Sequence, residues 1–387
     1  MMTLLLMIIF TSFISLGLPD SLLGAAWPVM HLDLGVPLAN AGSLSMVISG
    51  GSILSSLFSG KLIARFGTGK LTLISVLMTA VALFGFYSLP SFFWLVIAAI
   101  PLGLGGGAVD AGLNNFVALH YRAQYMNWLH CFWGVGATIG PIILAYFIGQ
   151  NNQWRKGYLA ISIIQFILVV ILFLSLPLWK KVETDLLESQ PESKKNESKN
   201  LFKVKGIFPA LISFFSYSAV ETTAHVWGSS YLVNYQAIPA KTAANWLSLF
   251  FVGITLGRFI AGFLTIKITS KHLMRAGSLA ILAGSLLMIL PLPSIFLMIG
   301  LILIGLGCAP IYPAMVHETP QRFGKTLSQS IIGFQMAFAA IGSMTMPLFF
   351  GFLTTKFSMS IYPYFLLVSA LVMIASTERI NYSSKKG

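Results

Sequence analysis

Three acidic residues fall within long apolar stretches of this 387-residue chain: Asp20, Asp110 and Glu221. An ionised carboxylate in hydrocarbon is costly unless it is paired, protonated or facing water. Such groups are therefore candidates for binding a polar ligand or for taking up and releasing a proton. Plainer interpretations stand beside these: Asp20 lying close enough to an interface to be solvated, and Asp110 joining two helices through a hydrogen bond.

Asp20 follows Pro19, which interrupts a helix and frees backbone groups that a cavity or a protein neighbour must satisfy. Trp27 shares the helix face of Asp20, and its ring is of a kind that stacks on the apolar face of a sugar. The sequence therefore predicts a broken first helix with a ligand-binding face.

Asp110 follows the glycine-rich run 103–107, which allows close approach of a neighbouring helix. Asn114 lies one turn further on, so a carboxylate and an amide share one face. This pair suits a sugar hydroxyl or the hydrogen-bonded control of a proton.

Glu221 has Tyr217 one turn before it and His225 one turn after it. The acid and the imidazole could exchange a proton during function, or could simply satisfy each other. Arg258 is a possible counter-charge, but it lies only nine residues before Lys267, so we expect it to extend to the cytoplasmic interface instead.

Further polar and aromatic side chains fall at comparable depth and complete the predicted ligand-contact set. With Asp20, Trp27, Asn114, Tyr217 and Glu221, the set contains Asn115, His130, Trp133, Trp227, Asn245, Tyr312 and Gln335. Single aromatic residues in an apolar chain more often pack on lipid or on other helices, and a lone His more often hydrogen-bonds at an interface.

The composition indicates the elements that carry these residues, because 56% of the chain is hydrophobic and only 9% is charged. A bilayer span needs about 20 predominantly apolar residues. Twelve stretches qualify, at 3–30, 40–63, 71–88, 91–119, 126–149, 157–178, 207–233, 241–266, 273–291, 294–316, 326–353 and 358–378. The first has no basic segment before it and no cleavage pattern, so we interpret it as a membrane helix and not as a signal peptide.

The charges are distributed unevenly across these spans. Of 24 Lys and Arg residues, 19 fall in loops on the side of the N-terminus, 4 in the opposite loops, and Arg258 lies within a span. The positive-inside rule then places both termini in the cytoplasm of a multi-pass protein of the cytoplasmic membrane. The net charge of +13 reflects topology and contact with an anionic lipid bilayer, and nucleic acid is not an expected partner.

The long hydrophilic segment 180–205 divides the chain. It separates residues 1–179 from residues 206–379, each with six expected helices, and residues 380–387 form a tail. The segments 60–65 and 262–267 are alike at an offset of about 200 residues, which indicates an internal repeat.

The sequence around Gly60, followed by Arg65, Gly67 and Lys70, resembles the signature loop of the major facilitator superfamily. The resemblance implies an all-α fold of twelve helices in two six-helix bundles, with this loop gating the cytoplasmic side. Ala64 stands where the loop usually carries an acidic residue, so a charge latch is not implied. Ordinary positive-inside charge is the alternative explanation of the loop.

The helix with Asp110 four residues before Asn114 is similar to the fucose permease group of sugar:proton symporters. That likeness implies that Asp110 carries the proton and that Asp20 binds substrate or couples it. Glu221 and His225 are additional to the group's pattern, so the proton site could instead lie in the second half.

We therefore expect a secondary active transporter working by alternating access, as a proton-coupled symporter of a hexose or similar small polar metabolite. A proton-driven efflux antiporter for drugs or amphipathic metabolites is the alternative. The polar residues Asn114, Asn115, Asn245 and Gln335 argue against it. No P-loop, zinc spacing or nucleophile elbow indicates an enzyme, and no cofactor or metal is expected. The superfamily resemblance implies that a monomer functions, while the substrate, the choice of proton or sodium, and the direction of flux stay open.

Overall fold

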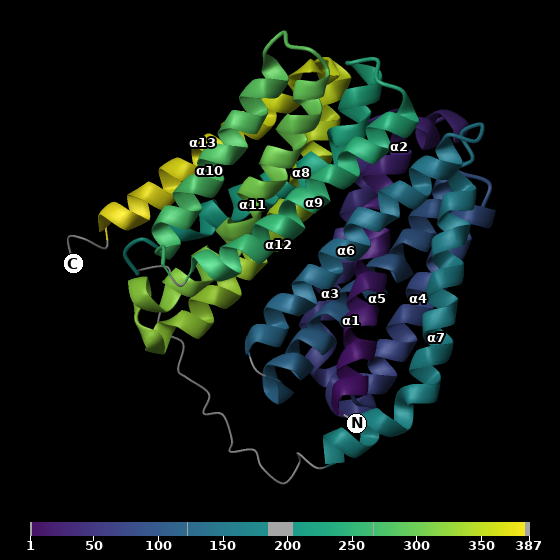
Figure 1. The fold of residues 1–387 in the computed structure, drawn as a ribbon, viewed down its shortest axis with the longest axis vertical. Coiled ribbons are helices and arrows are strands. Elements are labelled where there is room, and N and C mark those ends of the chain that lie inside the picture. Colours follow the sequence, from purple (N-terminus) through teal and green to yellow (C-terminus); the bar gives the residue numbers. More distant parts are fainter. Residues whose placement is uncertain (1, 122, 185–203, 266, 384–387) are drawn as a thin grey trace. The chain divides into compact units, whose positions relative to one another are not determined.

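A computed structural model describes residues 2–121, 123–184, 204–265 and 267–383, which lie in helices and short connections (Figure 1). The helices are α1 (Met2–Asp20), α2 (Leu22–Asp33), α3 (Asn40–Phe66), α4 (Thr68–Ser88), α5 (Phe92–His120), α6 (Ala123–Ile148), α7 (Trp154–Thr184), α8 (Ile207–Asn234), α9 (Ala240–Leu264), α10 (Ser270–Ile289), α11 (Ile295–Phe323), α12 (Lys325–Lys356), the short 3-10 helix η2 (Met359–Ile361) and α13 (Tyr362–Ser383).

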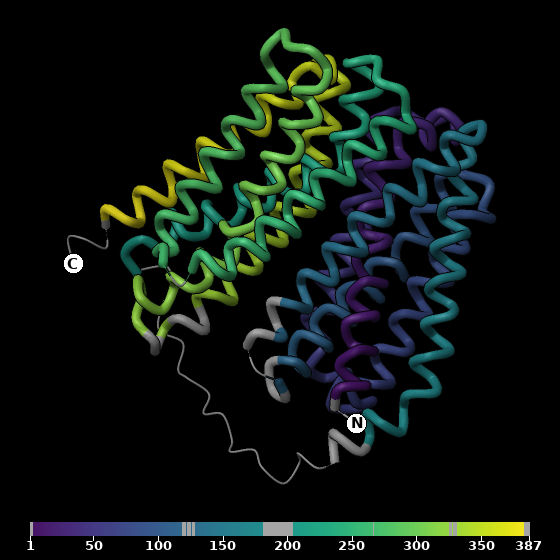
Figure 2. The backbone as a smooth tube through the Cα atoms, in the orientation of Figure 1, coloured from purple at the N-terminus to yellow at the C-terminus, as the bar shows by residue number. Residues whose placement is uncertain are grey.

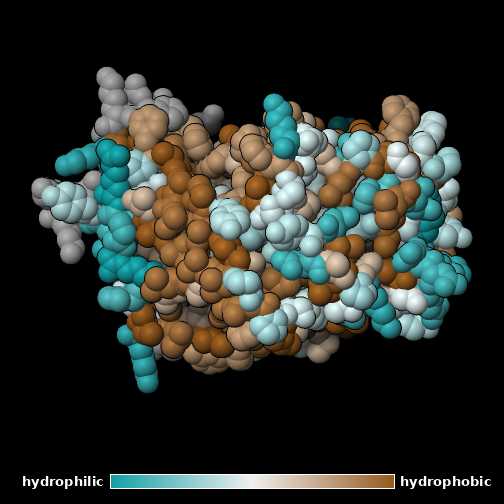
Figure 3. Space-filling view, turned by 90° about the horizontal axis from the view of Figure 1, so that it is seen from above, coloured by the Kyte–Doolittle hydropathy of each residue, from teal (hydrophilic) through white to brown (hydrophobic). Residues whose placement is uncertain are grey.

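Eleven segments of the described chain are long and apolar enough to cross a membrane, with α1 and α2 together forming the first, Thr3–Asp33. The predicted span at 207–233 corresponds to α8, which has 28 residues but is too polar to be among the eleven. Large hydrophobic side chains are exposed along the other helices, and brown patches cover much of the face in Figure 3. The predicted all-α polytopic membrane fold is confirmed.

The chain forms two compact units, which Figure 2 traces from purple and blue into green and yellow. Unit 1 contains Met1–Val36 and Val47–Asn196, and unit 2 contains Pro37–Met46 and Glu197–Gly387. Of the predicted linker at 180–205, residues 185–203 lie outside the described part of the chain. The same holds for residues 384–387 of the predicted tail.

Glycine brings α1 and α6 of unit 1 into backbone contact. A Cβ atom added to Gly17 would lie 2.1 Å from the carbonyl oxygen of Trp133, and one added to Gly136 would lie 2.0 Å from that of Ile14. No larger residue fits at either position without displacing a helix.

The glycine run in α5 allows neighbouring helices to approach closely, as the sequence predicts. A Cβ at Gly103 would lie 2.1 Å from the Ile48 carbonyl oxygen of α3, and one at Gly105 would lie 2.5 Å from the Ser75 carbonyl oxygen of α4. Alternate glycines thus fit α5 against two different neighbours.

The two units repeat this packing. A Cβ at Gly51 of α3 would lie 3.0 Å from Leu104 N of α5, and one at Gly253 of α9 would lie 2.9 Å from Leu306 N of α11, an offset of 202 residues in both partners. The predicted internal repeat is therefore visible in equivalent helix contacts.

The first helix of each unit follows the same repeat. Ile14 O of α1 faces Gly136 of α6, and Phe215 O of α8 faces Gly342 of α12. The offset of 201 residues between Ile14 and Phe215 also relates Asp20 to Glu221. Asp20 and Glu221, two of the three acidic residues that the sequence singled out, thus occupy equivalent positions in the repeat.

Candidate functional site

Asp20 lies at the break in the first span. Helix α1 ends at Asp20 and α2 begins at Leu22, as Pro19 predicts. The span runs from Thr3 to Asp33, so Asp20 is about 20 Å from the Asp33 end at 1.5 Å per residue. This depth argues against the interpretation of Asp20 as a solvated interface residue.

Trp133 of α6 holds the Asp20 carboxylate in place. Its Nε1–H donates a hydrogen bond of 2.8 Å to Asp20 Oδ2. The backbone contact at Gly17 fixes the separation of the two helices just before this bond. Asp20 is nevertheless exposed, so its carboxylate can accept further hydrogen bonds from a ligand.

Asp110 and Asn114 of α5 lie on one helix face, as their spacing predicts, and the structure joins them by hydrogen bonds. Asn114 Nδ2 donates to Asp110 Oδ1 at 2.9 Å and to the Asp110 carbonyl oxygen at 2.9 Å. The buried Asn114 Oδ1 has no hydrogen-bond partner among the described residues, so it can accept a donor from a ligand. Asp110 also lies within electrostatic range of Asp20, which brings into one region the two carboxylates that the sequence singles out in unit 1.

Other predicted contact residues of unit 1 differ in exposure. Asn115 is exposed, and half-buried His130 presents its ring edge-on to Phe13 at a centroid distance of 6.0 Å. Trp27 is fully buried and packs against Phe92 at 6.2 Å. Trp27 therefore belongs to the packed interior, although the sequence predicts it on the helix face that binds a ligand.

In unit 2, Glu221 of α8 pairs with Arg258 of α9. Arg258 Nη2 lies 3.6 Å from Glu221 Oε1, and the two side chains are only 18% and 22% exposed. The expectation that Arg258 extends to the interface is wrong. An unpaired carboxylate at this depth is costly, and the long arginine side chain reaches it from the adjacent helix.

Among the described residues no hydrogen bond joins His225 to Glu221, so the predicted link between the acid and the imidazole is not formed in this structure. The His225 Nδ1 atom is buried without a hydrogen-bond partner in the described chain, and its ring packs against Phe251 at 5.7 Å. The buried hydroxyl of Tyr217 lies beside the Glu221 carboxylate and interacts with it. His225 Nδ1 thus retains hydrogen-bonding capacity for a ligand or water.

Three further predicted residues of unit 2 lie in different surroundings. Tyr312 packs against Tyr217 at 5.7 Å, and its hydroxyl donates to the sulfur of Met336. Trp227 is fully buried, and Asn245 is half-buried near the start of α9. Tyr312 therefore joins the Tyr217 and Glu221 region.

Gln335 of α12 and Trp227 use their polar groups inside the protein. Gln335 Oε1 accepts a hydrogen bond of 3.0 Å from the Thr319 hydroxyl, and Trp227 Nε1–H donates to the Pro347 carbonyl oxygen at 3.0 Å. These bonds connect helices in the folded state, so a ligand could bind these polar groups only by replacing the bonds.

The predicted gating loop is a sharp turn between α3 and α4. Gly67 alone joins the two helices, with φ of 76°. Gly60, Arg65 and Lys70 are exposed, and the Arg65 guanidinium lies 5.5 Å above the Phe66 ring. Gly324 joins α11 to α12 in the same way, with φ of 81°.

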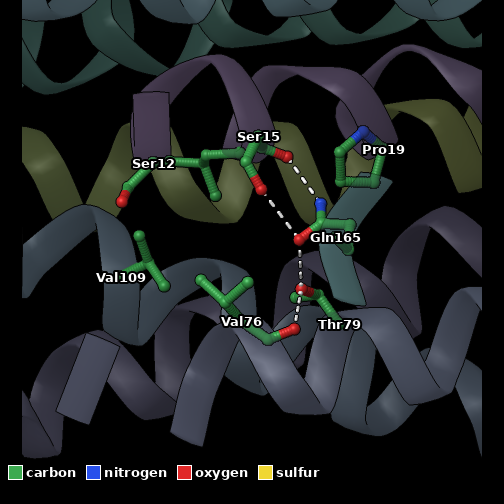
Figure 4. A pocket seen from close by; sticks show the side chains of 8 residues that line it. Ser12, Ser15, Pro19, Val76, Thr79, Val109 and Gln165 are labelled. Atoms are coloured by element: carbon green, nitrogen blue, oxygen red, sulfur yellow. Dashed lines mark hydrogen bonds between the residues drawn. The ribbon is translucent and has the colours of Figure 1, made fainter. Parts of the chain in front are cut away.

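Sequence reasoning missed Gln165 of α7. This buried residue hydrogen-bonds to Ser15 of α1 and to Thr79 of α4 (Figure 4). It is the single Gln within the predicted span 157–178, which was the signal available.

A second missed group is the buried Glu318 of α11, whose Oε2 lies 3.5 Å from Arg322 Nε and 4.0 Å from Lys271 Nζ. Its four-residue spacing from Arg322 was the available signal. Among the described residues, no group of three His, Cys, Asp or Glu side chains could hold a metal ion.

The chain has membrane-spanning helices in two repeated units. The first helix of each unit carries a carboxylate that a residue from another helix contacts. This arrangement is typical of a secondary transporter. The sequence matches the model of the Major Facilitator Superfamily over residues 5–240 and 210–377. The chain belongs to this superfamily and is a transporter, not an enzyme.

Curated relatives and solved structures agree with this assignment. The chain is 23% identical over 368 residues to Bypass of stop codon protein 6 of Saccharomyces cerevisiae, covering 87% of this chain and 74% of that protein. It is 25% identical over 282 residues to the glucose/mannose transporter GlcP of Bacillus subtilis, covering 68% of this chain and 66% of that protein.

Among solved structures, the nucleoside transporter NupG superposes with a TM-score of 0.76 at 14% identity, covering 97% of this chain and 98% of NupG. A D-xylose-proton symporter gives 0.69 at 14% identity, covering 95% and 96%. At these identities the likeness to solved structures concerns the fold.

Proposed function

We propose that this chain is a proton-coupled symporter for a hexose or a similar small polar metabolite. The observation that carries the proposal is the hydrogen bond from Trp133 to Asp20 in mid-span, in electrostatic range of the Asp110 and Asn114 pair. These four side chains bring two carboxylates, an amide and an indole into one region of unit 1.

This set of groups matches the surface of a sugar. Carboxylate and amide oxygens accept hydrogen bonds from hydroxyl groups, and the indole ring offers an apolar face to ring C–H groups. The accessible Asp20 carboxylate and the unpartnered Asn114 Oδ1 supply acceptors within the described residues. A hydroxyl-rich ligand would therefore be bound here without leaving these acceptors unsatisfied.

We assign the coupling proton to Asp110. Its carboxylate accepts a hydrogen bond from Asn114 and lies in the same region as Asp20, whereas Glu221 lies in unit 2 and pairs with Arg258. Burying an ionised carboxylate in the membrane interior is costly, and protonation of Asp110 would remove that cost. Proton binding at Asp110 and substrate binding near Asp20 would then favour the same conformations. Differential affinity of this kind is what alternating access requires.

The relatives support a sugar-type substrate. GlcP is named as a glucose/mannose transporter, and its match covers 68% of this chain. The four-residue spacing of Asp110 and Asn114 resembles the fucose permease group, and that closer likeness is part of the proposal.

We further propose that the chain works as a monomer in the cytoplasmic membrane with both termini in the cytoplasm, as its charge distribution indicates. Its functional division would be residues 1–179 and 206–379, joined by a linker at 180–205 and followed by a tail at 380–387.

The test is uptake of a panel of radiolabelled sugars into membrane vesicles, with and without an inward proton gradient. Wild type, Asp110→Asn and Asp20→Asn are compared with Asp33→Asn, the same change at a half-exposed carboxylate at the end of α2. Exchange of sugar between the two sides without a gradient is measured in parallel, because it requires binding and translocation but no net proton movement.

Gradient-driven accumulation of one sugar by wild type and by Asp33→Asn would support the proposal. We expect Asp110→Asn to lose accumulation but retain exchange, and Asp20→Asn to lose both. Accumulation that survives in both Asp110→Asn and Asp20→Asn would refute it. Lowered internal levels of dyes or drugs in place of sugar uptake would indicate efflux.

A further inference from the structure

Pro19 creates a gap in the hydrogen bonding of α1. In an α-helix the N–H of each residue donates to the carbonyl oxygen four residues earlier, and proline has no N–H. The carbonyl oxygen of Ser15 therefore lacks its helical donor, although α1 continues to Asp20. A buried carbonyl group without a donor is costly in the membrane interior.

Gln165 of α7 supplies the missing donor. Its Nε2–H donates to the Ser15 carbonyl oxygen at 2.7 Å, and its Oε1 accepts the Ser15 hydroxyl at 2.8 Å (Figure 4). The Gln165 side chain thus replaces the backbone N–H that Pro19 lacks and also satisfies the neighbouring hydroxyl. With only 1% exposure, Gln165 makes these bonds without competition from water.

Thr79 of α4 completes the arrangement. Its single hydroxyl hydrogen can be donated either to Gln165 Oε1, at 3.2 Å, or to the Val76 carbonyl oxygen, at 2.8 Å. The amide orientation is set by Ser15, whose carbonyl oxygen can only accept a hydrogen bond and therefore faces Nε2. A cavity of about 10 Å³ borders Ser15, Pro19, Thr79 and Gln165. This volume is at the lower limit of what can hold one water molecule, so the surroundings of the break are nearly filled.

We infer that Gln165 is a positioning residue for the proposed transport site: its amide substitutes for the hydrogen bond lost at Pro19 and so fixes the end of α1 that carries Asp20. Asp20 directly follows Pro19, and its carboxylate must meet Trp133 Nε1 at 2.8 Å. A small rotation of the last turn of α1 would separate them. The functional part of this inference depends on the proposed role of Asp20. The structural part, in which the Gln165 amide replaces the N–H that Pro19 lacks, does not.

The test is a double-mutant cycle with Gln165→Leu, Pro19→Ala and the combined variant. Alanine at position 19 restores an N–H that can donate to Ser15 O, so the two changes must be coupled if Gln165 acts as inferred. Gln335→Leu, alone and with Pro19→Ala, is the control, because Gln335 is also buried and hydrogen-bonded but lies in unit 2.

Thermal unfolding of the purified protein gives the first readout and needs no substrate. We expect Gln165→Leu to lower Tm clearly in the wild-type background and much less in the Pro19→Ala background, while the effect of Gln335→Leu is the same in both. Equal effects of Gln165→Leu in the two backgrounds would overturn the inference.

Transport gives the second readout, once a substrate is found. We expect Gln165→Leu to raise the KM for the transported substrate about tenfold, which corresponds to the free energy of one hydrogen bond. The combined variant should have a KM close to that of wild type. A reduced amount of folded protein with unchanged KM and pH profile would show a purely structural role. If the Tm effects of Gln165→Leu and Pro19→Ala are coupled but wild type transports no sugar, the proposed function is contradicted and the structural role of Gln165 is not.

Discussion

Glu221 and Arg258 form an ion pair inside unit 2, with 3.6 Å between Oε1 and Nη2. Glu221 occupies the same place in its unit as Asp20 does in the other, but its partner is a cation, whereas Asp20 has a neutral indole. Equivalent carboxylates in the two units thus have different electrostatic surroundings. This difference is why we assign substrate binding and proton coupling to unit 1.

Arg258→Met should destabilise the protein by about 2–4 kcal/mol, because it leaves Glu221 unpaired in the interior. Glu221→Gln combined with Arg258→Met should recover part of this loss. The comparison is Arg275→Met, which breaks a pair with Glu378 whose side chains are 51% and 39% exposed. We expect it to lose about 1 kcal/mol or less in thermal unfolding. Similar losses at both sites would contradict the prediction.

Trp133→Phe removes the hydrogen bond to Asp20 and keeps an aromatic ring. A hydrogen bond to a charged group contributes about 1.5–3 kcal/mol, so KM for the transported sugar should rise at least about tenfold. Trp94→Phe is the control, because Trp94 is 47% exposed on α5. An unchanged KM in Trp133→Phe would mean that this indole does not orient Asp20 for binding.

Gly17→Ala should destabilise the contact of α1 with α6, since its Cβ would meet the Trp133 carbonyl oxygen at 2.1 Å. Overpacking of this kind costs about 1–3 kcal/mol and should also reduce transport by displacing Trp133. Gly333→Ala is the matched control, because a Cβ there has nothing within 4 Å. The control should be neutral or slightly stabilising, since alanine favours helix more than glycine does.

Gly67→Ala should destabilise the turn between α3 and α4. Gly67 has φ of 76° and ψ of 160°, a conformation that other residues avoid at a cost of about 1–3 kcal/mol. Gly60→Ala in the preceding helix, with nothing within 4 Å of the added Cβ, should have little effect on thermal unfolding. Equal stability of the two variants would show that the turn adapts.

The proposed topology predicts which loops a membrane-impermeant maleimide can reach in intact cells. In a background with Cys131→Ala and Cys308→Ala, Gln150→Cys after α6 should be labelled from outside. Lys70→Cys at the start of α4 should be labelled only after permeabilisation. The reverse pattern would place both termini outside and overturn the charge-based assignment.

The sequence alone was sufficient for features set by local geometry. Long apolar stretches predict the spans, Pro19 predicts the break in the first helix, and four-residue spacing predicts that Asp110 and Asn114 share one helix face. Each depends only on helical periodicity or on the chemistry of one residue.

Tertiary structure decided the partners that come from other helices: Trp133 for Asp20, Arg258 for Glu221, and Gln165 for the Ser15 carbonyl. In a membrane protein the lipid-facing and protein-facing sides of a helix are both apolar, so sequence pattern does not reveal how each helix is rotated. Trp27 illustrates the limit, because it shares the predicted helix face of Asp20 and yet is buried against Phe92. Glycine contacts between backbones fix those rotations, and they exist only once the helices have packed.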